Sequence, residues 1–371
     1  MKRLSIIVPS LKGGGIARVM TQLAEALAAR RLFSTVDLVI LVRRGPRRYT
    51  VGSAVDLVEL GAPRLAAAVK PLVRYLRQRR PDAILSAGDP ANLVTLVSCA
   101  LARSRARTVL SVHTNVTTHT GNERRSGAPL RLALVPLLIQ LLYRRANAVA
   151  AVSSGVAADL VSNCKVPERL IRVISNPAVP MNLETLVEEQ VEHPWLSPDR
   201  TERVVLAAGR LVPQKDFPTL LRALAALRKH LPARLLIIGE GGLRQELLST
   251  AERLGIADAV DLPGFAANPY AWMARADLFV LSSAWEGFGN VLVEAMACGT
   301  PVVSTDCPSG PADILMHGNI GPLVPVGDSD ALAAAMLATL RRPPSRERLI
   351  ARAGAFSLEA ASSEYYNALA G

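Results

Sequence analysis

The stretch from Glu286 to Glu294, EGFGNVLVE, continues as AMACGTPVV over residues 295–303 and decides the fold expected for this chain. The apolar run LFVL at residues 278–281 precedes it and is typical of a buried strand. The residues after the glycines have helical spacing, namely Val291, Leu292, Glu294, Ala295 and Met296. The pattern predicts a strand, a glycine-containing turn and a helix.

Two carboxylates, Glu286 and Glu294, flank this turn. The first backbone N–H groups of the helix, at Asn290, Val291 and Leu292, would lack intrahelical partners, and with the helix dipole they favour an anion. The glutamates would repel a phosphate that they faced, so they suit hydroxyl groups on either side of it. The pattern therefore indicates a phosphate flanked by two polyols, that is, a nucleotide sugar.

Strand-like and helix-like patterns alternate along the chain, which predicts α/β domains with parallel sheets. The strand-like runs are residues 4–8, 36–42, 83–86, 108–112, 148–152, 204–208, 234–239, 259–262, 278–281 and 301–304, with amphipathic stretches such as 17–29 and 66–78 between them. A chain of 371 residues suits two domains. The alternation pauses at residues 176–180, NPAVP, and at the acidic stretch 184–192, so we expect the boundary there.

The positive charge lies in the first half of the chain. The net charge is +12, and residues 1–180 hold 27 Lys and Arg against 9 Asp and Glu. A basic half favours a polyanionic partner, and by charge alone both nucleic acid and anionic lipid fit. No apolar run reaches the ~18 residues of a spanning helix, no secretion signal is recognised, and the four separated cysteines suit a reducing cytosol.

Four sequence blocks in order resemble the retaining glycosyltransferases of family 4. Glu286 and Glu294 match the Glu-x7-Glu signature of that family. VVLAAGRLVPQKD at 204–216 resembles its G-R-x4-K block, and LLIIGEG at 235–241 resembles the next strand and turn. DCPSGPADIL at 306–315 resembles a block of members that build bacterial surface polysaccharides and lipid-linked glycans.

The resemblance implies a GT-B fold, two doubly wound Rossmann-like domains with a cleft between them. Residues 1–180 would bind the acceptor, residues 181–355 the donor, and a helix at 356–371 would pack back on the N-terminal domain. The implied reaction moves a hexose or N-acetylhexosamine, with retention, from a UDP-linked donor to a lipid-linked or surface-polysaccharide acceptor. We expect a cytoplasmic protein, peripheral on the inner face of an anionic membrane, with no cofactor, no metal and no nucleic-acid partner.

The resemblance also implies a role for each site residue. Glu286 would bind the donor sugar, Glu294 the ribose, and the turn at Phe288, Gly289, Asn290, Val291 and Leu292 would supply backbone amides. Arg210 and Lys215 would stabilise the departing diphosphate in place of a metal. His113 would lie beside the reacting carbon, Gly15 near the donor, and Gly13 and Gly14 near the acceptor. We assign no carboxylate nucleophile; the acceptor would attack on the leaving-group face.

Several of these features also have plainer explanations. The loop Gly13–Gly15 fits an ordinary strand–helix turn, and Arg18 breaks the dinucleotide fingerprint G-x-G-x-x-G. His113 fits a structural role at a strand end. Asp328 and Asp330 resemble a metal motif in spelling, but they are better explained as a helix N-cap and a first-turn acid.

The apolar stretch at residues 129–143, PLRLALVPLLIQLLY, leaves two interpretations open. It fits a buried helix, and it fits a helix lying in a membrane interface. The flanking residues Arg124, Arg125, Arg144 and Arg145 favour the second. So does a basic helix face formed by Lys70, Arg74 and Arg77, which Arg79 and Arg80 follow. Two other functions also remain: a nucleotide-sugar 2-epimerase on the same fold, and a basic nucleic-acid-binding protein, which lacks a recognisable binding module.

Overall fold

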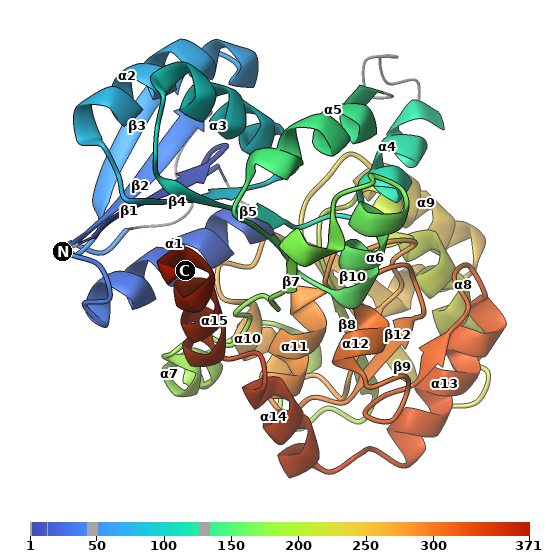
Figure 1. Cartoon of the computed structure of the whole chain (residues 1–371). Helices are drawn as coiled ribbons and strands as arrows, with labels where there is room; N and C mark the ends of the chain where they lie inside the picture. Colours follow the sequence, from blue (N-terminus) through green and yellow to red (C-terminus); the bar gives the residue numbers. More distant parts are fainter. Residues whose placement is uncertain (1, 13, 43–50, 126–133) are drawn as a thin grey trace. The chain divides into compact units, whose positions relative to one another are not determined.

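The computed structural model describes residues 2–12, 14–42, 51–125 and 134–371 (Figure 1). The chain divides into two compact units. The N-terminal unit comprises Met1–Pro177 with Leu358–Gly371, and the C-terminal unit comprises Ala178–Ser357. The sequence predicts boundaries after residues 180 and 355, within three residues of these.

The N-terminal unit is built on a parallel sheet of order β3-β2-β1-β4-β5-β6-β7. Its strands are β1 Arg3–Val8, β2 Thr35–Val42, β3 Asp56–Ala62, β4 Ala83–Ala87, β5 Arg107–Val112, β6 Ala148–Ala151 and β7 Ile171–Val173. Its helices are α1 Gly15–Ala29, α2 Val69–Arg79, α3 Asp89–Ala102, α4 Val116–Arg125, α5 Val135–Leu142, α6 Ser154–Ser162 and α15 Leu358–Ala370.

Helices cover both faces of this sheet, which is why its central strands are continuously apolar. Alternate residues of β1 supply the two sides: Leu4 and Ile6 pack in one cluster with α1, and Ile7 packs in another with α2 and α3. These inward side chains are fully buried. Helix packing on two faces therefore explains the apolar runs that predicted the strands.

The helix α15 belongs to the N-terminal unit, although it follows the whole C-terminal unit in sequence. It lies against α1 in Figure 1, and its Tyr365 and Leu369 are buried in the same cluster as the α1 side chains. Arg107 Nε donates a hydrogen bond to the Ala368 carbonyl oxygen at 2.8 Å. The end of the chain thus completes a core begun at its start.

The C-terminal unit has a second parallel sheet, of order β10-β9-β8-β11-β12-β13. Its strands are β8 Arg203–Ala208, β9 Ala233–Ile238, β10 Val260–Gly264, β11 Leu278–Leu281, β12 Val302–Thr305 and β13 Leu323–Val324. Its helices are α7 Leu183–Glu188, α8 Phe217–Leu227, α9 Arg244–Arg253, α10 Pro269–Arg275, α11 Asn290–Ala297, α12 Pro311–Ile314, α13 Ser329–Arg341 and α14 Arg346–Gly354.

Each sheet has one point at which the strand order reverses: between β1 and β4, and between β8 and β11. In such open sheets the loops after the carboxyl ends of the two strands diverge and leave room for a ligand. The expected α/β class with two doubly wound units is confirmed. The switch points show where each unit can hold its ligand.

The turn between β11 and α11 packs against the loop after β12. A Cβ on Gly310 would lie 1.9 Å from the Phe288 carbonyl oxygen, and the Gly310 φ is +96°. The Glu286 amide donates to the Pro308 carbonyl oxygen at 3.2 Å. Only glycine allows this approach at residue 310, so the position of the turn depends on it.

We predict that Gly310→Ala destabilises the C-terminal unit more than Gly318→Ala. Gly318 has a similar φ, +91°, but a Cβ there would meet nothing within 4 Å. Gly318→Ala, the control, should lower the free energy of unfolding by ~1–2 kcal/mol through left-handed backbone strain alone. Gly310→Ala should lower it by about 1–3 kcal/mol more because of the clash. Tryptophan fluorescence during urea unfolding measures this, because Trp195, Trp272 and Trp285 all lie in this unit. Equal losses in both variants would contradict the argument.

Candidate functional site

Two residues expected in the site meet at the switch point of the C-terminal unit. Lys215 ends a short 3₁₀ helix, Pro213–Lys215, after β8, and Glu286 follows β11. The Lys215 ammonium forms an ion pair with Glu286 Oε1, and Ser283 Oγ donates to the same oxygen at 2.7 Å. The two side chains are only 13% and 10% exposed. Lys215 and Glu286 thus form one buried, hydrogen-bonded charge pair.

Hydrogen bonds between the two loops hold this pair in position. Ser282 Oγ donates to the Lys215 carbonyl oxygen at 2.8 Å. The Ala284 amide donates to the Gln214 carbonyl oxygen at 2.8 Å, and Gln214 Nε2 donates to the Trp285 carbonyl oxygen at 2.9 Å. The serines and Gln214 lay outside the sequence prediction, because a short polar side chain beside a strand end carries no distinctive pattern.

The glycine turn leads into α11 as expected. Gly289 is its N-cap with φ +101°, and Phe288 is buried against the ring of Phe356 at 5.5 Å between centroids. The Leu292 amide donates to the Gly289 carbonyl oxygen at 2.9 Å, so the expectation that it lacks a partner is wrong. The helical backbone at Asn290 and Val291 closes this i→i+3 bond, which satisfies the amide at the helix start.

Glu294 and Arg210 differ sharply in burial. Glu294 lies one helical turn into α11 and is 1% exposed, as a carboxylate that accepts hydrogen bonds in a confined site would be. Arg210 follows β8 and is exposed, and in the part of the chain that the structure describes its guanidinium has no ion pair. It is therefore available to an anion.

The glycine loop of the N-terminal unit follows β1, at the other switch point. Gly13 lies outside the described residues. Gly14 is the N-cap of α1 with φ +97°, and Gly15 is the first residue of that helix. Gly88, which the sequence analysis does not single out, is the N-cap of α3 after β4 with φ +92°, and a Cβ there would lie 3.4 Å from Ile16 Cδ1. The two glycine-rich helix starts therefore lie side by side.

His113 follows β5 in the N-terminal unit and is partly buried. Its Nε2 is hydrogen-bonded to Ser111 Oγ at 2.9 Å. Burial lowers the pKa of His113 to about 4, so the imidazole is neutral at pH 7. It can donate or accept a hydrogen bond there, but it supplies no positive charge.

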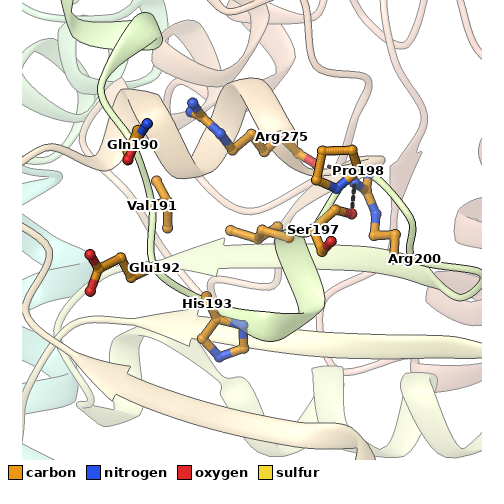
Figure 2. Close-up of a pocket in the computed structure, with 9 residues that line it drawn as sticks. Gln190, Val191, Glu192, His193, Ser197, Pro198, Arg200 and Arg275 are labelled. Atoms are coloured by element: carbon orange, nitrogen blue, oxygen red, sulfur yellow. Dashed lines mark hydrogen bonds between the residues drawn. The ribbon is translucent and has the colours of Figure 1, made fainter.

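A pocket of about 500 Å³ lies elsewhere in the C-terminal unit, and none of the expected site residues lines it. Figure 2 shows its walls, which include His193, Arg200 and Arg275. His193 Nε2 is 2.9 Å from Asp261 Oδ2, and the guanidinium of Arg200 pairs with Asp277 at 3.1 Å. Arg275 donates to the Val187 carbonyl oxygen at 3.1 Å. These bonds hold the wall of the pocket together, and Lys215, Glu286 and Glu294 lie outside its lining.

The candidate metal motif has a structural role. Asp328 is the N-cap of α13, and its Oδ1 accepts a hydrogen bond from the Ala331 amide at 2.9 Å. Across the described ranges, no group of three or more His, Cys, Asp or Glu side chains could hold a metal ion. The interpretation of Asp328 as a helix cap is confirmed.

Family models match both halves of the chain. The model for glycosyltransferase family 4 matches residues 13–179, and the model for glycosyl transferases group 1 matches residues 189–355. The second match contains Arg210, Lys215, Glu286 and Glu294.

Among curated proteins, the chain is similar to the N-acetylgalactosamine-N,N'-diacetylbacillosaminyl-diphospho-undecaprenol 4-alpha-N-acetylgalactosaminyltransferase of Campylobacter jejuni. The two are 35% identical over 195 residues, 53% of this chain and 51% of that protein, so the match spans about half the length of this relative. The lipopolysaccharide core biosynthesis glycosyltransferase LpsE of Rhizobium meliloti is 29% identical over 368 residues, 97% of this chain and 96% of that one.

Among solved structures, Anabaena HepE in complex with UDP-glucose superposes with a TM-score of 0.77 at 21% identity, covering 100% of both chains. At this identity the likeness concerns the fold. The family models account for both units, and the fold agrees with them over the whole length: this chain belongs to the glycosyltransferases of family 4 type with the GT-B fold.

Proposed function

We propose that this chain is a retaining glycosyltransferase that transfers a hexose or N-acetylhexosamine from a UDP-linked donor to a lipid-linked or surface-polysaccharide acceptor. The observation that carries the proposal is the buried Lys215–Glu286 pair beside the glycine turn that begins α11. The names of the relatives support the substrate classes: one acts on a diphospho-undecaprenol-linked sugar, another in lipopolysaccharide core synthesis, and HepE binds UDP-glucose.

The C-terminal unit would hold the donor. Glu294, buried on α11, would accept hydrogen bonds from the ribose hydroxyls, and Glu286 from hydroxyls of the transferred sugar. The backbone amides from Phe288 to Val291 would face the diphosphate, whose charge suits the N-terminal end of α11. Because the Leu292 amide already has a partner, it is left out of this assignment.

The departing diphosphate needs fixed positive charge. Exposed Arg210 would contact it in a bidentate manner, and the Lys215 ammonium, oriented by Glu286, would act as a point charge. These two cations and the helix N-terminus would stand in for a metal ion, so we propose a metal-independent reaction. His113 is neutral and would contribute a hydrogen bond near the anomeric carbon rather than charge.

The reaction would exchange one bond at the anomeric carbon for another on the same face. The bond from this carbon to the diphosphate oxygen breaks, and the acceptor oxygen forms the new bond from the leaving-group side. The acceptor proton passes to the departing diphosphate. The N-terminal unit would hold the acceptor near the loop of Gly13 and Gly14, with Gly15 close to the donor phosphates.

We also propose that the N-terminal unit docks on the inner face of an anionic membrane. No helix among the described residues is long and apolar enough to span a bilayer. The helix α5 is instead a surface helix, in which Ile139 is the buried residue. Four leucines on or next to it are 41–59% exposed and follow i, i+3, i+4, i+7 spacing: Leu134, Leu137, Leu138 and Leu141.

Basic residues accompany this leucine face. Arg144 and Arg145 are exposed directly after α5. The helix α3 contacts both α5 and α2, and α2 and its C-cap carry exposed Lys70, Arg74, Arg77, Arg79 and Arg80. An apolar helix face and exposed basic residues in the same unit suit the interface of an anionic bilayer. Residues 129–133 lie outside the described residues.

The first test is transfer itself. Purified enzyme with a panel of radiolabelled nucleotide sugars and a bacterial lipid extract should produce a labelled glycolipid, and the new linkage should keep the donor's anomeric configuration by NMR. EDTA should leave the rate unchanged. Conversion of the donor without any acceptor would support an epimerase instead. Complete loss of activity in EDTA, restored by Mg²⁺, would reject metal independence.

Arg210→Ala should lower turnover by about 10²–10³-fold, the cost of one preorganised charge partner. Because Arg210 is exposed, the thermal stability of Arg210→Ala should equal that of the wild type. Lys215→Ala should be less stable, because it leaves the buried Glu286 carboxylate without its ion-pair partner. Arg342→Ala is the matched control, because Arg342 is exposed at the end of α13. Wild-type turnover in Arg210→Ala would reject its role.

The two glutamates should separate in their effects. Glu294→Gln should weaken UDP binding by about 10- to 100-fold, the value of hydrogen bonds to a charged group. Glu286→Gln should lower turnover while changing UDP affinity little, because UDP lacks the sugar. Calorimetry with UDP and steady-state kinetics measure both. The opposite pattern would invert the assignment.

Vesicles of phosphatidylglycerol should bind the protein at low salt and release it at high salt, since the Debye length shortens. Vesicles of phosphatidylcholine should bind it poorly. Replacing Leu137 and Leu141 with Gln should weaken binding without changing UDP affinity, and Leu101→Gln, an exposed leucine at the end of α3, is the control. No sedimentation with anionic vesicles at low salt would overturn the docking proposal and leave the transferase proposal standing.

A further inference from the structure

A chain of hydrogen bonds in the N-terminal unit connects the C-terminal helix with His113. The hydroxyl groups of Tyr365, on α15, and Ser111, in β5, are 2.8 Å apart. Ser111 Oγ is also 2.9 Å from His113 Nε2. Tyr365 and Ser111 are fully buried. The contact joins residues 254 positions apart in sequence.

The buried phenol fixes the direction of these bonds. Burial raises the pKa of Tyr365 to about 12, so its hydroxyl keeps the proton at neutral pH. In the described part of the chain, Ser111 Oγ is the one hydrogen-bond partner of that hydroxyl. A buried donor without an acceptor is costly, so Tyr365 donates and Ser111 Oγ accepts.

The single proton of Ser111 must then point elsewhere. Its other partner is His113 Nε2, so Ser111 donates to this nitrogen. A neutral imidazole whose Nε2 accepts a hydrogen bond carries its own proton on Nδ1. The reverse order would place the imidazole proton on Nε2 and leave the buried phenol proton without an acceptor.

We infer that α15 sets the tautomer of His113: Tyr365, acting through Ser111, holds Nε2 as an acceptor and leaves Nδ1–H as the hydrogen-bond donor of the ring. Tyr365 and Ser111 are positioning residues, and their effect on catalysis rests on the proposed place of His113 beside the reacting carbon. A protonated Nδ1 suits an oxygen of the donor sugar or of the acceptor, because both carry lone pairs.

Long-range ¹H–¹⁵N spectra of ¹⁵N-histidine-labelled protein test the inference without any substrate. The five histidines give a small spectrum, and His113→Gln identifies the signal of interest. At neutral pH the wild type should show Nδ1 protonated and Nε2 unprotonated. In Tyr365→Phe, Ser111 no longer accepts a hydrogen bond from the phenol, so it can either donate to Nε2 or accept a proton from it. The chemical shifts of both ring nitrogens should therefore move towards those of a mixture of tautomers. A wild-type ring protonated on Nε2 would overturn the inference.

Tyr366→Phe is the matched control. Tyr366 is the next residue of α15 and packs edge-on against Phe33, away from the hydrogen-bond chain. This variant should leave the His113 signals unchanged. Ser111→Ala is the second variant, should Tyr365→Phe fail to fold, and it should also release the tautomer. Unchanged ring nitrogens in a folded Tyr365→Phe or Ser111→Ala protein would refute the inference.

Kinetics separate this inference from the proposed function. In Tyr365→Phe, only the fraction of molecules whose His113 carries its proton on Nδ1 should be active. The kcat should therefore fall about two- to tenfold, while the donor KM stays unchanged. Tyr366→Phe should keep the wild-type kcat. The ¹⁵N chemical shifts of the His113 ring could change in Tyr365→Phe while His113→Gln transfers sugar at the wild-type rate. In that case the tautomer inference holds, and the role of His113 in the proposed function fails.

Discussion

Both units are constrained by the rule that parallel neighbouring strands must be joined by crossovers over one face of the sheet. In a doubly wound sheet the crossovers run outwards from the centre in both directions, so one pair of central neighbours has loops that diverge. These pairs are β1 with β4 and β8 with β11. The residues assigned to the donor follow β8 and β11, and the glycine helix starts follow β1 and β4.

The Lys215–Glu286 pair shows how one unit resolves a conflict of charge. An ammonium group and a carboxylate lie at one point, and neither is stable alone when buried. Pairing them removes most of the cost, and Ser283 supplies a further hydrogen bond to the carboxylate. Arg210, by contrast, is exposed, and its guanidinium forms no ion pair with the residues that the structure describes.

The sequence predicted the parts of the fold whose pattern is local. The strands inside the two sheets have continuous apolar runs, and the sequence predicts the ends of each to within a residue or two. They are β1, β2, β4, β5, β6, β8, β9, β11 and β12. The edge strands β3, β7 and β13 were missed, because β3 and β7 are half exposed and β13 has two residues. The Leu292 amide was misjudged, since the i→i+3 bond that it makes depends on the backbone angles of Asn290 and Val291 rather than on sequence spacing.

Contacts between distant residues account for what the sequence left undetermined in the candidate site. Lys215 and Glu286 were each expected there, but their pairing requires the adjacency of β8 and β11, which the strand order alone reveals. The partnership of Ser111 with Tyr365 is more remote still, because nothing near either residue in the sequence signals it. In the helix Val135–Leu142, Ile139 is the buried residue, so this part of the apolar stretch lies at the surface of the unit, which composition alone did not show.

The return of α15 to the N-terminal unit has a consequence for synthesis of the protein. A ribosome makes β1 to β7 first, then the whole C-terminal unit, and only then the residues that cover α1 and bond Ser111. During translation the nascent first unit therefore exposes the apolar surface that Tyr365 and Leu369 later bury, which is a natural binding surface for chaperones. Newly made molecules would acquire a fixed His113 ring only after the last helix has been translated.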